Sequence, residues 1–261
     1  MKFSKYLLAM LAGASLAAGF TGCQSEDKFL TEHSYTFNDQ TFYTSESDME
    51  MGLNSCYRQI QSLMMGQTHG GHSWMIEGLG LDTYAPTNGN GDFGNWANLN
   101  SSNGFTRHWY DNLYTLINRA NTVIDMMDER TSITYSSETR KAELRATAVF
   151  FRGWAYRVLA SMYGNVPILE HHATEIQTGY EPSNRQAVWE FCKQDFTYAA
   201  QNLPIKVDKP GQIVRAAADH YLAEINLALG DFNGAVEAAT RVLNGTDGDY
   251  HVMTTRFGSR A

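Results

Sequence analysis

Apolar positions recur at intervals of three and four residues over most of the chain, which is the period of an α-helix with one buried face. The period predicts helices over residues 47 to 64, 109 to 127 and 144 to 162, the last stopping at Gly164. The first of them opens with residues 47 to 50 (SDME), an order that fits a capping box. No stretch shows a convincing two-residue alternation of the kind found in strands.

The last third of the chain predicts three more helices. Residues 183 to 186 could cap one that runs to Leu203 and ends at Pro204, and residues 215 to 244 form a pair joined at Gly230-Asp231. This pair places small and large residues roughly where a tetratricopeptide repeat needs them: Leu222, Ala223, Gly230, Phe232, Ala235, Ala239 and Val242. A weaker copy of this pattern ends at Gly164. Gly164 lies 66 residues before Gly230, a spacing close to two repeats of about 34 residues. We therefore expect a mainly α fold of stacked helical pairs, which present a surface to a partner.

One segment, residues 66 to 107, has no helical period and contains nine glycines. Ordered loops much longer than about 15 residues are usually functional, and the alternative is disorder. Trp74, Tyr84 and Trp96 argue against disorder, because disordered segments are poor in aromatic residues. We expect an irregular, loop-rich lobe packed on the helices.

The N-terminus has the features of a secretory signal peptide over residues 1 to 22. Its apolar run is too short to cross a bilayer, which needs about 20 residues. Residues 20 to 23 (FTGC) resemble a bacterial lipobox, so we expect Cys23 to carry the lipid anchor. Cleavage elsewhere, for instance after residues 12 to 14, would leave Cys23 as an incidental thiol. We expect an extended leader over residues 23 to 44 and the helical domain over residues 45 to 261.

Charge and cysteine content narrow the function. The formal net charge is −8 and there is no basic cluster, so nucleic acid and anionic lipid surfaces are poor partners. Cys56 and Cys192 lie in helical patterns, where we expect two small buried hydrophobes; a disulfide between them is the alternative in an oxidising compartment.

Several stretches occur in an order that resembles one family. They are "CQSEDKFL", "LNSCYRQI", "NRANTVID", "AELRATAVFFRGWAYRVLASMYGNVPIL", "NRQAVWEFCKQDFTYAAQNLP" and "GQIVRAAADHYLAEINLALGD". Together they resemble the SusD/RagB family of outer-membrane nutrient-uptake lipoproteins of the Bacteroidetes, and they span nearly all of residues 23 to 244. Two positions depart from the family pattern: no proline follows "FL", and Glu224 stands where a lysine is frequent. Family members are much longer, so the chain looks like an N-terminal part of one.

The resemblance implies a non-catalytic binding protein on the outer face of the outer membrane. Such proteins sit as a lid over a TonB-dependent β-barrel transporter and deliver an oligosaccharide, or in some relatives a peptide, to it. Residues 25 to 27 (SED) resemble an acidic tag for surface export, the alternative being a solvated linker. A competing function is a structural or adhesive lipoprotein whose helical repeats bind only protein.

The lobe holds the candidate ligand-binding residues. Sugars are bound by flat aromatic faces together with planar amide or carboxylate groups that pair with hydroxyls. Both kinds are present in Trp74, Asp82, Tyr84, Trp96, Asn98 and Asn100. Trp96 is the first candidate because its surroundings are polar and flexible; the alternative is that the aromatic rings form the lobe's own small core.

Calcium binding by the lobe has weaker support in the sequence. Asn88, Asn90 and Asp92 alternate as in a calcium loop, but Phe93 and Leu99 stand where the glycine and the bidentate acid are needed, so calcium binding stays open.

The histidines predict no zinc site. His69 and His72, and the pair His171-His172, lack a cysteine or carboxylate at ligand spacing, so we expect exposed loop histidines. The chain also has no nucleophile elbow, zinc-hydrolase helix motif or phosphate-binding glycine loop, so we expect no enzymatic activity and no cofactor.

Overall fold

The computed structural model describes residues 39 to 65, residue 100 and residues 102 to 250. The chain divides into two parts, residues 1 to 42 and 43 to 261, and each is described by itself. The described end of the first part is a single helical turn, α3 (Asp39–Phe42). The leader that we expected to be extended up to Thr44 is therefore partly helical.

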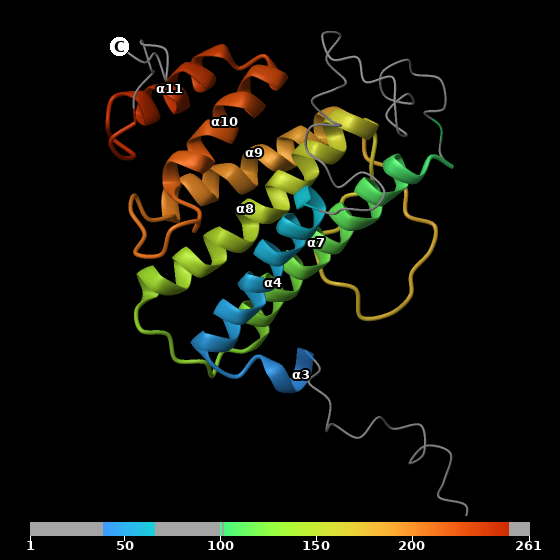
Figure 1. The fold of residues 1–261 in the computed structure, drawn as a ribbon, viewed down its shortest axis with the longest axis horizontal. Coiled ribbons are helices and arrows are strands. Elements are labelled where there is room, and N and C mark those ends of the chain that lie inside the picture. The colour runs from blue at the N-terminus through green and yellow to red at the C-terminus, as the bar shows by residue number, and fades with distance from the viewer. Residues whose placement is uncertain (1–38, 66–99, 101, 251–261) are drawn as a thin grey trace, which may run out of the picture. The chain divides into compact units, whose positions relative to one another are not determined.

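The second part contains six described helices. They are α4 (Glu46–Met65), α7 (Gly104–Glu129), α8 (Glu138–Tyr163), α9 (Arg185–Asn202), α10 (Arg215–Leu229) and α11 (Phe232–Leu243). Consecutive helices pack side by side from α4 to α11 (Figure 1). Within the described ranges the nearest feature to a strand is one isolated antiparallel bridge between Val166 and Ser183. The predicted mainly α fold of helical pairs is confirmed.

Helix α8 lies at the centre of the stack and contacts α4, α7, α9 and α10. Its buried residues lie on several faces, and many are small, which lets neighbouring helices approach closely. A Cβ on Gly153 would lie 3.1 Å from the Cβ of Asp195 on α9. The core around α8 includes the fully buried rings of Phe151, Tyr156 and Phe196.

The start of α4 differs slightly from the prediction, whereas that of α9 lies within the predicted residues 183 to 186. At α4 the Oγ of Ser45 accepts a hydrogen bond from the Asp48 N–H (3.3 Å), and the Asp48 carboxylate accepts one from the Thr44 N–H (3.0 Å). The reciprocal cap thus lies two residues before the predicted box at residues 47 to 50. At α9 the cap is Asn184, whose Oδ1 accepts from the Ala187 N–H at 2.8 Å.

The turn between α10 and α11 forms where the sequence predicted it. Gly230 is left-handed with φ 79°, and Asp231 caps α11 by accepting from the Gly234 N–H at 2.9 Å. The predicted packing positions hold only in part. Ala235 is buried, but Phe232 is 67% exposed and Ala238 is more deeply buried than Ala239. The face of α11 that meets α10 is therefore rotated from the repeat pattern.

Both cysteines of the helical domain are buried, free thiols, Cys56 in α4 and Cys192 in α9. The prediction of two small buried hydrophobes is confirmed, and the alternative of a disulfide between them is wrong. Burial raises the pKa of Cys56 to about 12, so its thiol stays protonated and unreactive at neutral pH.

Candidate functional site

Most of the predicted site lies outside the described residues. This holds for the anchor Cys23, for the calcium-like loop over residues 88 to 92, and for the ligand candidates Trp74, Asp82, Tyr84, Trp96 and Asn98. All of these remain predictions.

Asn100 is the one described ligand candidate, and it is exposed just before α7. Its Oδ1 accepts from the Ser102 N–H (2.9 Å), and its carbonyl accepts from the Asn103 N–H (3.0 Å) and the Thr106 hydroxyl (3.2 Å). These bonds make Asn100 part of the turn that leads into α7. A role of Asn100 in ligand binding remains a prediction.

Helix α4 ends at Met65, just before the predicted lobe, and α7 begins at Gly104, so the last four residues of the predicted lobe (104 to 107) are helical. The two helices are joined by polar contacts as well as by apolar packing. Gln59 donates to the Oδ1 of Asn112 at 2.8 Å, and Arg119 donates to the carbonyl of Ser55 at 2.7 Å. Binding loops are commonly carried by such a rigid scaffold.

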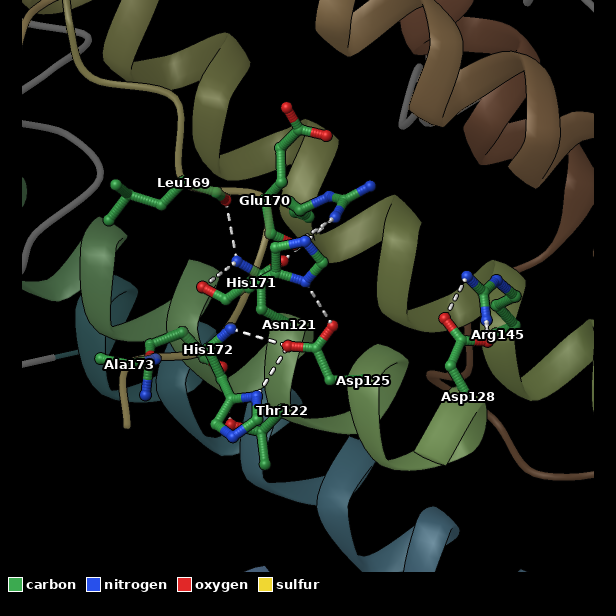
Figure 2. A network of polar contacts seen from close by, with 12 residues as sticks. Asn121, Thr122, Asp125, Asp128, Arg145, Leu169, Glu170, His171, His172 and Ala173 are labelled. Atoms are coloured by element: carbon green, nitrogen blue, oxygen red, sulfur yellow. Dashed lines mark hydrogen bonds and ion pairs between the residues drawn. The ribbon is translucent and has the colours of Figure 1, made fainter. Parts of the chain in front are cut away.

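A polar network on α7 fastens the connection between α8 and α9 (Figure 2). Asn121 donates from Nδ2 to the carbonyl of Leu169 at 2.8 Å and to that of His171 at 3.2 Å. Asn118 accepts from the Ala173 N–H at 2.8 Å. Two polar residues of the "NRANTVID" stretch thus hold the last residue of "YGNVPIL" and the chain that follows it. In the structure, Asn118 and Asn121 position the connection between α8 and α9.

Asp125 is the buried centre of this network. Its Oδ2 accepts from the His172 N–H (2.8 Å) and lies 2.6 Å from His172 Nδ1, and its Oδ1 lies 3.0 Å from His171 Nδ1. The His171 side chain is 84% exposed, whereas that of His172 is only 10% exposed. The expectation of two exposed histidines is therefore wrong for His172. It packs against an aspartate 47 residues earlier in the chain, a pairing that local spacing does not reveal.

The network shifts the titration of two groups in opposite directions. Burial alone raises the pKa of Asp125, but hydrogen bonds from the His172 N–H and from both imidazoles outweigh burial, and the pKa lies below its usual value. The hydrogen bond to Asp125 and the attraction of its charge raise the pKa of His171. At a pH between these two pKa values, Asp125 is negative and His171 is positive, and their attraction strengthens the network.

This arrangement predicts a bell-shaped pH dependence for the stability of the contacts that fasten residues 171 to 173 to α7. The stabilisation from Asp125 is lost as pH falls through its lowered pKa, below about 3.9, and that from His171 is lost as pH rises through its raised pKa, above about 6.5. Hydrogen exchange at the His172 and Ala173 amides should show it. His171→Gln should remove the loss at high pH and keep the loss at low pH. An unchanged profile in this variant would contradict the assignment.

Asn121 also links the network to a buried ion pair. Its Oδ1 accepts from Arg152 Nη1 of α8 at 3.1 Å. The same guanidinium donates from Nε and Nη2 to the two carboxylate oxygens of Asp195 on α9, at 2.9 and 2.8 Å. Burial raises the pKa of Asp195, and the contacts with Arg152 oppose this. These contacts tie three helices and one connection together.

A cleft of about 300 Å³ opens between α4, α8 and residues 204 to 213. Its size is at the lower end for ligand pockets. The aromatic residue in it, Tyr57, accepts from the Ile213 N–H at 2.9 Å and meets Phe151 edge-on at 4.7 Å. On the rim, Arg140 is bound by Glu50 and Glu143. Because Tyr57 and Arg140 are engaged by the protein itself, the cleft does not provide the flat aromatic face expected for sugar.

Two features are absent from residues 39 to 65, 100 and 102 to 250. There, no three His, Cys, Asp or Glu side chains lie together as ligands for a metal ion. No helix in the same ranges has both the length and the apolar character needed to span a bilayer.

Comparison with known proteins gives matches over most of the chain. A family model of SusD-like proteins, described as "Starch-binding associating with outer membrane", matches residues 28 to 227. A SusD-like protein of Bacteroides ovatus is 28% identical over 244 residues, which cover 88% of this chain and 41% of the relative. SusD-like protein P2 of Formosa agariphila is 24% identical over 214 residues, 78% of this chain and 40% of the relative. The chain thus spans about two fifths of these relatives.

Solved structures share the fold. A SusD-like carbohydrate binding protein of Bacteroides vulgatus aligns with a TM-score of 0.69 at 18% identity, covering 81% of this chain and 47% of that one. A laminarin binding SusD-like protein aligns with a TM-score of 0.64 at 21% identity, covering 78% of this chain and 44% of that one.

Proposed function

We propose that this chain, which belongs to the SusD-like family, captures an oligosaccharide at the cell surface without chemical conversion and delivers it to a TonB-dependent transporter. The observation that carries the proposal is the family match over residues 28 to 227, in a family described as starch-binding. A neighbour of the same fold is described as laminarin binding. These descriptions favour a glycan over a peptide as the ligand.

The location and the partner are part of the same proposal. The family description places such proteins with the outer membrane, and Cys23 follows a lipobox-like sequence. A lipid-anchored protein at the surface needs a route for its ligand across the outer membrane. A TonB-dependent β-barrel beneath it would supply that route.

The lobe is the proposed place of binding. Its candidates Trp74, Tyr84 and Trp96 offer ring faces to a sugar, while Asp82 and Asn98 offer planar polar groups. The contacts between α4 and α7 support this choice, because they fix both ends of the segment that carries these residues. A rigid base lowers the entropy lost when a loop is ordered around its ligand.

Trp96→Ala tests the proposed site. Loss of a central aromatic contact typically costs more than about 2 kcal/mol of binding, so the full-length protein should bind at least about thirtyfold more weakly. Its melting temperature should stay near wild type, because a ring that faces the ligand does not belong to the core. Calorimetric titration with starch- and laminarin-derived oligosaccharides measures the affinity, after a glycan and peptide array has selected the best probe.

Tyr180→Ala is the matched control, since Tyr180 is an exposed aromatic residue outside the lobe. It should change neither affinity nor stability. If Trp96→Ala keeps affinity and loses stability, Trp96 is a core residue and the site must be sought at Trp74 or Tyr84. An array that binds peptides or protein and no glycan would overturn the proposed ligand class.

A further inference from the structure

Two fully buried aspartates leave three carboxylate oxygens without a hydrogen-bond donor. Asp219 lies in α10, and Asp247 lies in the turn of residues 244 to 250 that follows α11. Asp219 Oδ2 and both carboxylate oxygens of Asp247 receive no hydrogen bond from any described residue. Burying an ionised carboxylate in this way is strongly unfavourable. A feature of the site must therefore offset the cost.

Nearby cations meet only part of this need. Arg241 on α11 donates from Nε to Asp219 Oδ1 at 2.9 Å, and its Nη2 donates to the same oxygen. Arg215 on α10 lines the same pocket, but its Nε donates to the carbonyl of Leu203 at 3.2 Å. From α9 the pocket receives Thr197 and Gln201, neither of which titrates.

A further charged residue, Glu237, lies near Arg241, which binds Asp219. Glu237 on α11 interacts with Arg241 and partly offsets its positive charge. The carboxyl groups of Asp219 and Asp247 line the same pocket, and each has at least one oxygen without a donor. Two carboxyl groups in that position can form a hydrogen bond only if one of them carries a proton.

We propose that a proton shared between the Asp219 and Asp247 carboxyl groups fastens the turn of residues 244 to 250 onto α10, so that the turn loosens when this proton leaves for solvent. In the closed turn the Asn244 N–H donates to Thr240 (2.9 Å) and the Asp247 N–H donates to Arg241 (3.2 Å), and these bonds open when the turn loosens. The turn forms one wall of a pocket of about 370 Å³ between α9, α10 and α11. Loosening of the turn would open this pocket.

The direction of the pH effect follows from the closed turn. Burial, then the hydrogen bond and the charge of Asp219, raise the pKa of Asp247 to about 6, although Arg215 and Arg241 oppose the rise. An exposed aspartate has a pKa of about 3.9. Closure is therefore favoured at low pH, and its advantage is lost as pH rises through about 6. The equilibrium constant for closing should fall about tenfold between pH 5 and pH 8.

Hydrogen exchange of the full-length mature protein tests this inference. After correction for the intrinsic exchange rate, protection at the Asn244 and Asp247 amides should fall about tenfold from pH 5 to pH 8. Asp247→Asn carries an uncharged amide, which can donate to Asp219 at every pH. In this variant protection should be the same at pH 5 and pH 8.

Asp249→Asn is the matched control, because Asp249 is an exposed carboxylate on the same turn. It should keep the tenfold fall. Amides in the centre of α8 should keep constant protection in all variants, which shows that only the turn responds. Equal protection of the wild-type turn at pH 5 and pH 8 would overturn the proposal, as would an undiminished fall in Asp247→Asn.

Discussion

Replacement of Cys23 by alanine should release the full-length protein from the outer membrane. Each buried CH₂ of a lipid chain contributes about 0.8 kcal/mol, and two or more chains make the attachment stable. The variant has no thiol at the lipobox-like sequence to accept them. It should therefore move from the membrane pellet to the soluble periplasmic fraction and lose all labelling with palmitate.

Cys192→Ala is the control for this experiment. Cys192 is a fully buried free thiol in α9, and burial raises its pKa well above the usual value, so no acyl transfer to it is expected. This variant should remain in the membrane fraction and keep the label. If Cys23→Ala still sediments with outer membrane and still labels, the anchor assignment is wrong.

The helices could be predicted from the sequence because each has a local signal. An apolar period of three to four residues predicted α4, α7 and α8, capping and proline signals predicted α9, and a repeat-like pattern predicted α10 and α11. Gly164 and Gly230 ended helices where expected, since a positive φ suits glycine. Burial of Cys56 and Cys192 followed from their place on apolar faces. These features depend on neighbours within one or two helical turns.

Features that depend on small rotations of a helix were predicted less well. Capping by Ser45 instead of Ser47 moves the start of α4 by two residues, and both serines precede acidic residues at short range. In α11 the repeat pattern favoured Phe232, Ala235, Ala239 and Val242, and of these only Ala235 is buried, together with Ala238. A rotation of about one residue changes which side chain faces the partner helix, because successive residues lie 100° apart.

The polar network was not predictable, because its partners are far apart in the sequence. His172 reaches Asp125 over 47 residues, and Arg152 reaches Asp195 over 43. Neither pair has a spacing that marks it. The family resemblance drew attention to "NRANTVID" and "FFRGWAY" as a matching order, but only the structure shows that polar residues from both stretches meet. In the lobe, the candidate ligand-binding residues are supported by their residue types alone.

Arg152→Met should lower the free energy of unfolding by about 3 to 5 kcal/mol, the usual cost when one partner of a buried ion pair is removed. The Arg152 and Asp195 side chains are only 12% and 5% exposed, so the remaining carboxylate would be buried without a partner. Asn121 Oδ1 would lose its bond from Arg152 as well. Methionine keeps the helix propensity and much of the volume, which limits the effect to the lost polar contacts. Urea denaturation measures the change.

The pH dependence of the stability lost in Arg152→Met provides a second test. Without the guanidinium, burial holds the pKa of Asp195 above that of an exposed aspartate. The loss should therefore be complete at neutral pH and should shrink as pH falls and Asp195 becomes protonated. The double variant Arg152→Met, Asp195→Leu should recover much of the stability, since well-packed apolar residues often replace a buried pair without loss.

Arg145→Met is the matched control, because Arg145 also binds both oxygens of its partner, Asp128, from Nη1 and Nη2 at 2.6 and 3.0 Å (Figure 2). The difference is burial, since Asp128 is 59% exposed. An exposed pair typically contributes up to about 1 kcal/mol. If both methionine variants lose the same stability, burial does not decide the strength of the Arg152 pair. If only Arg152→Met unfolds readily, this ion pair holds α8 to α9 and, through Asn121, supports the connection between them.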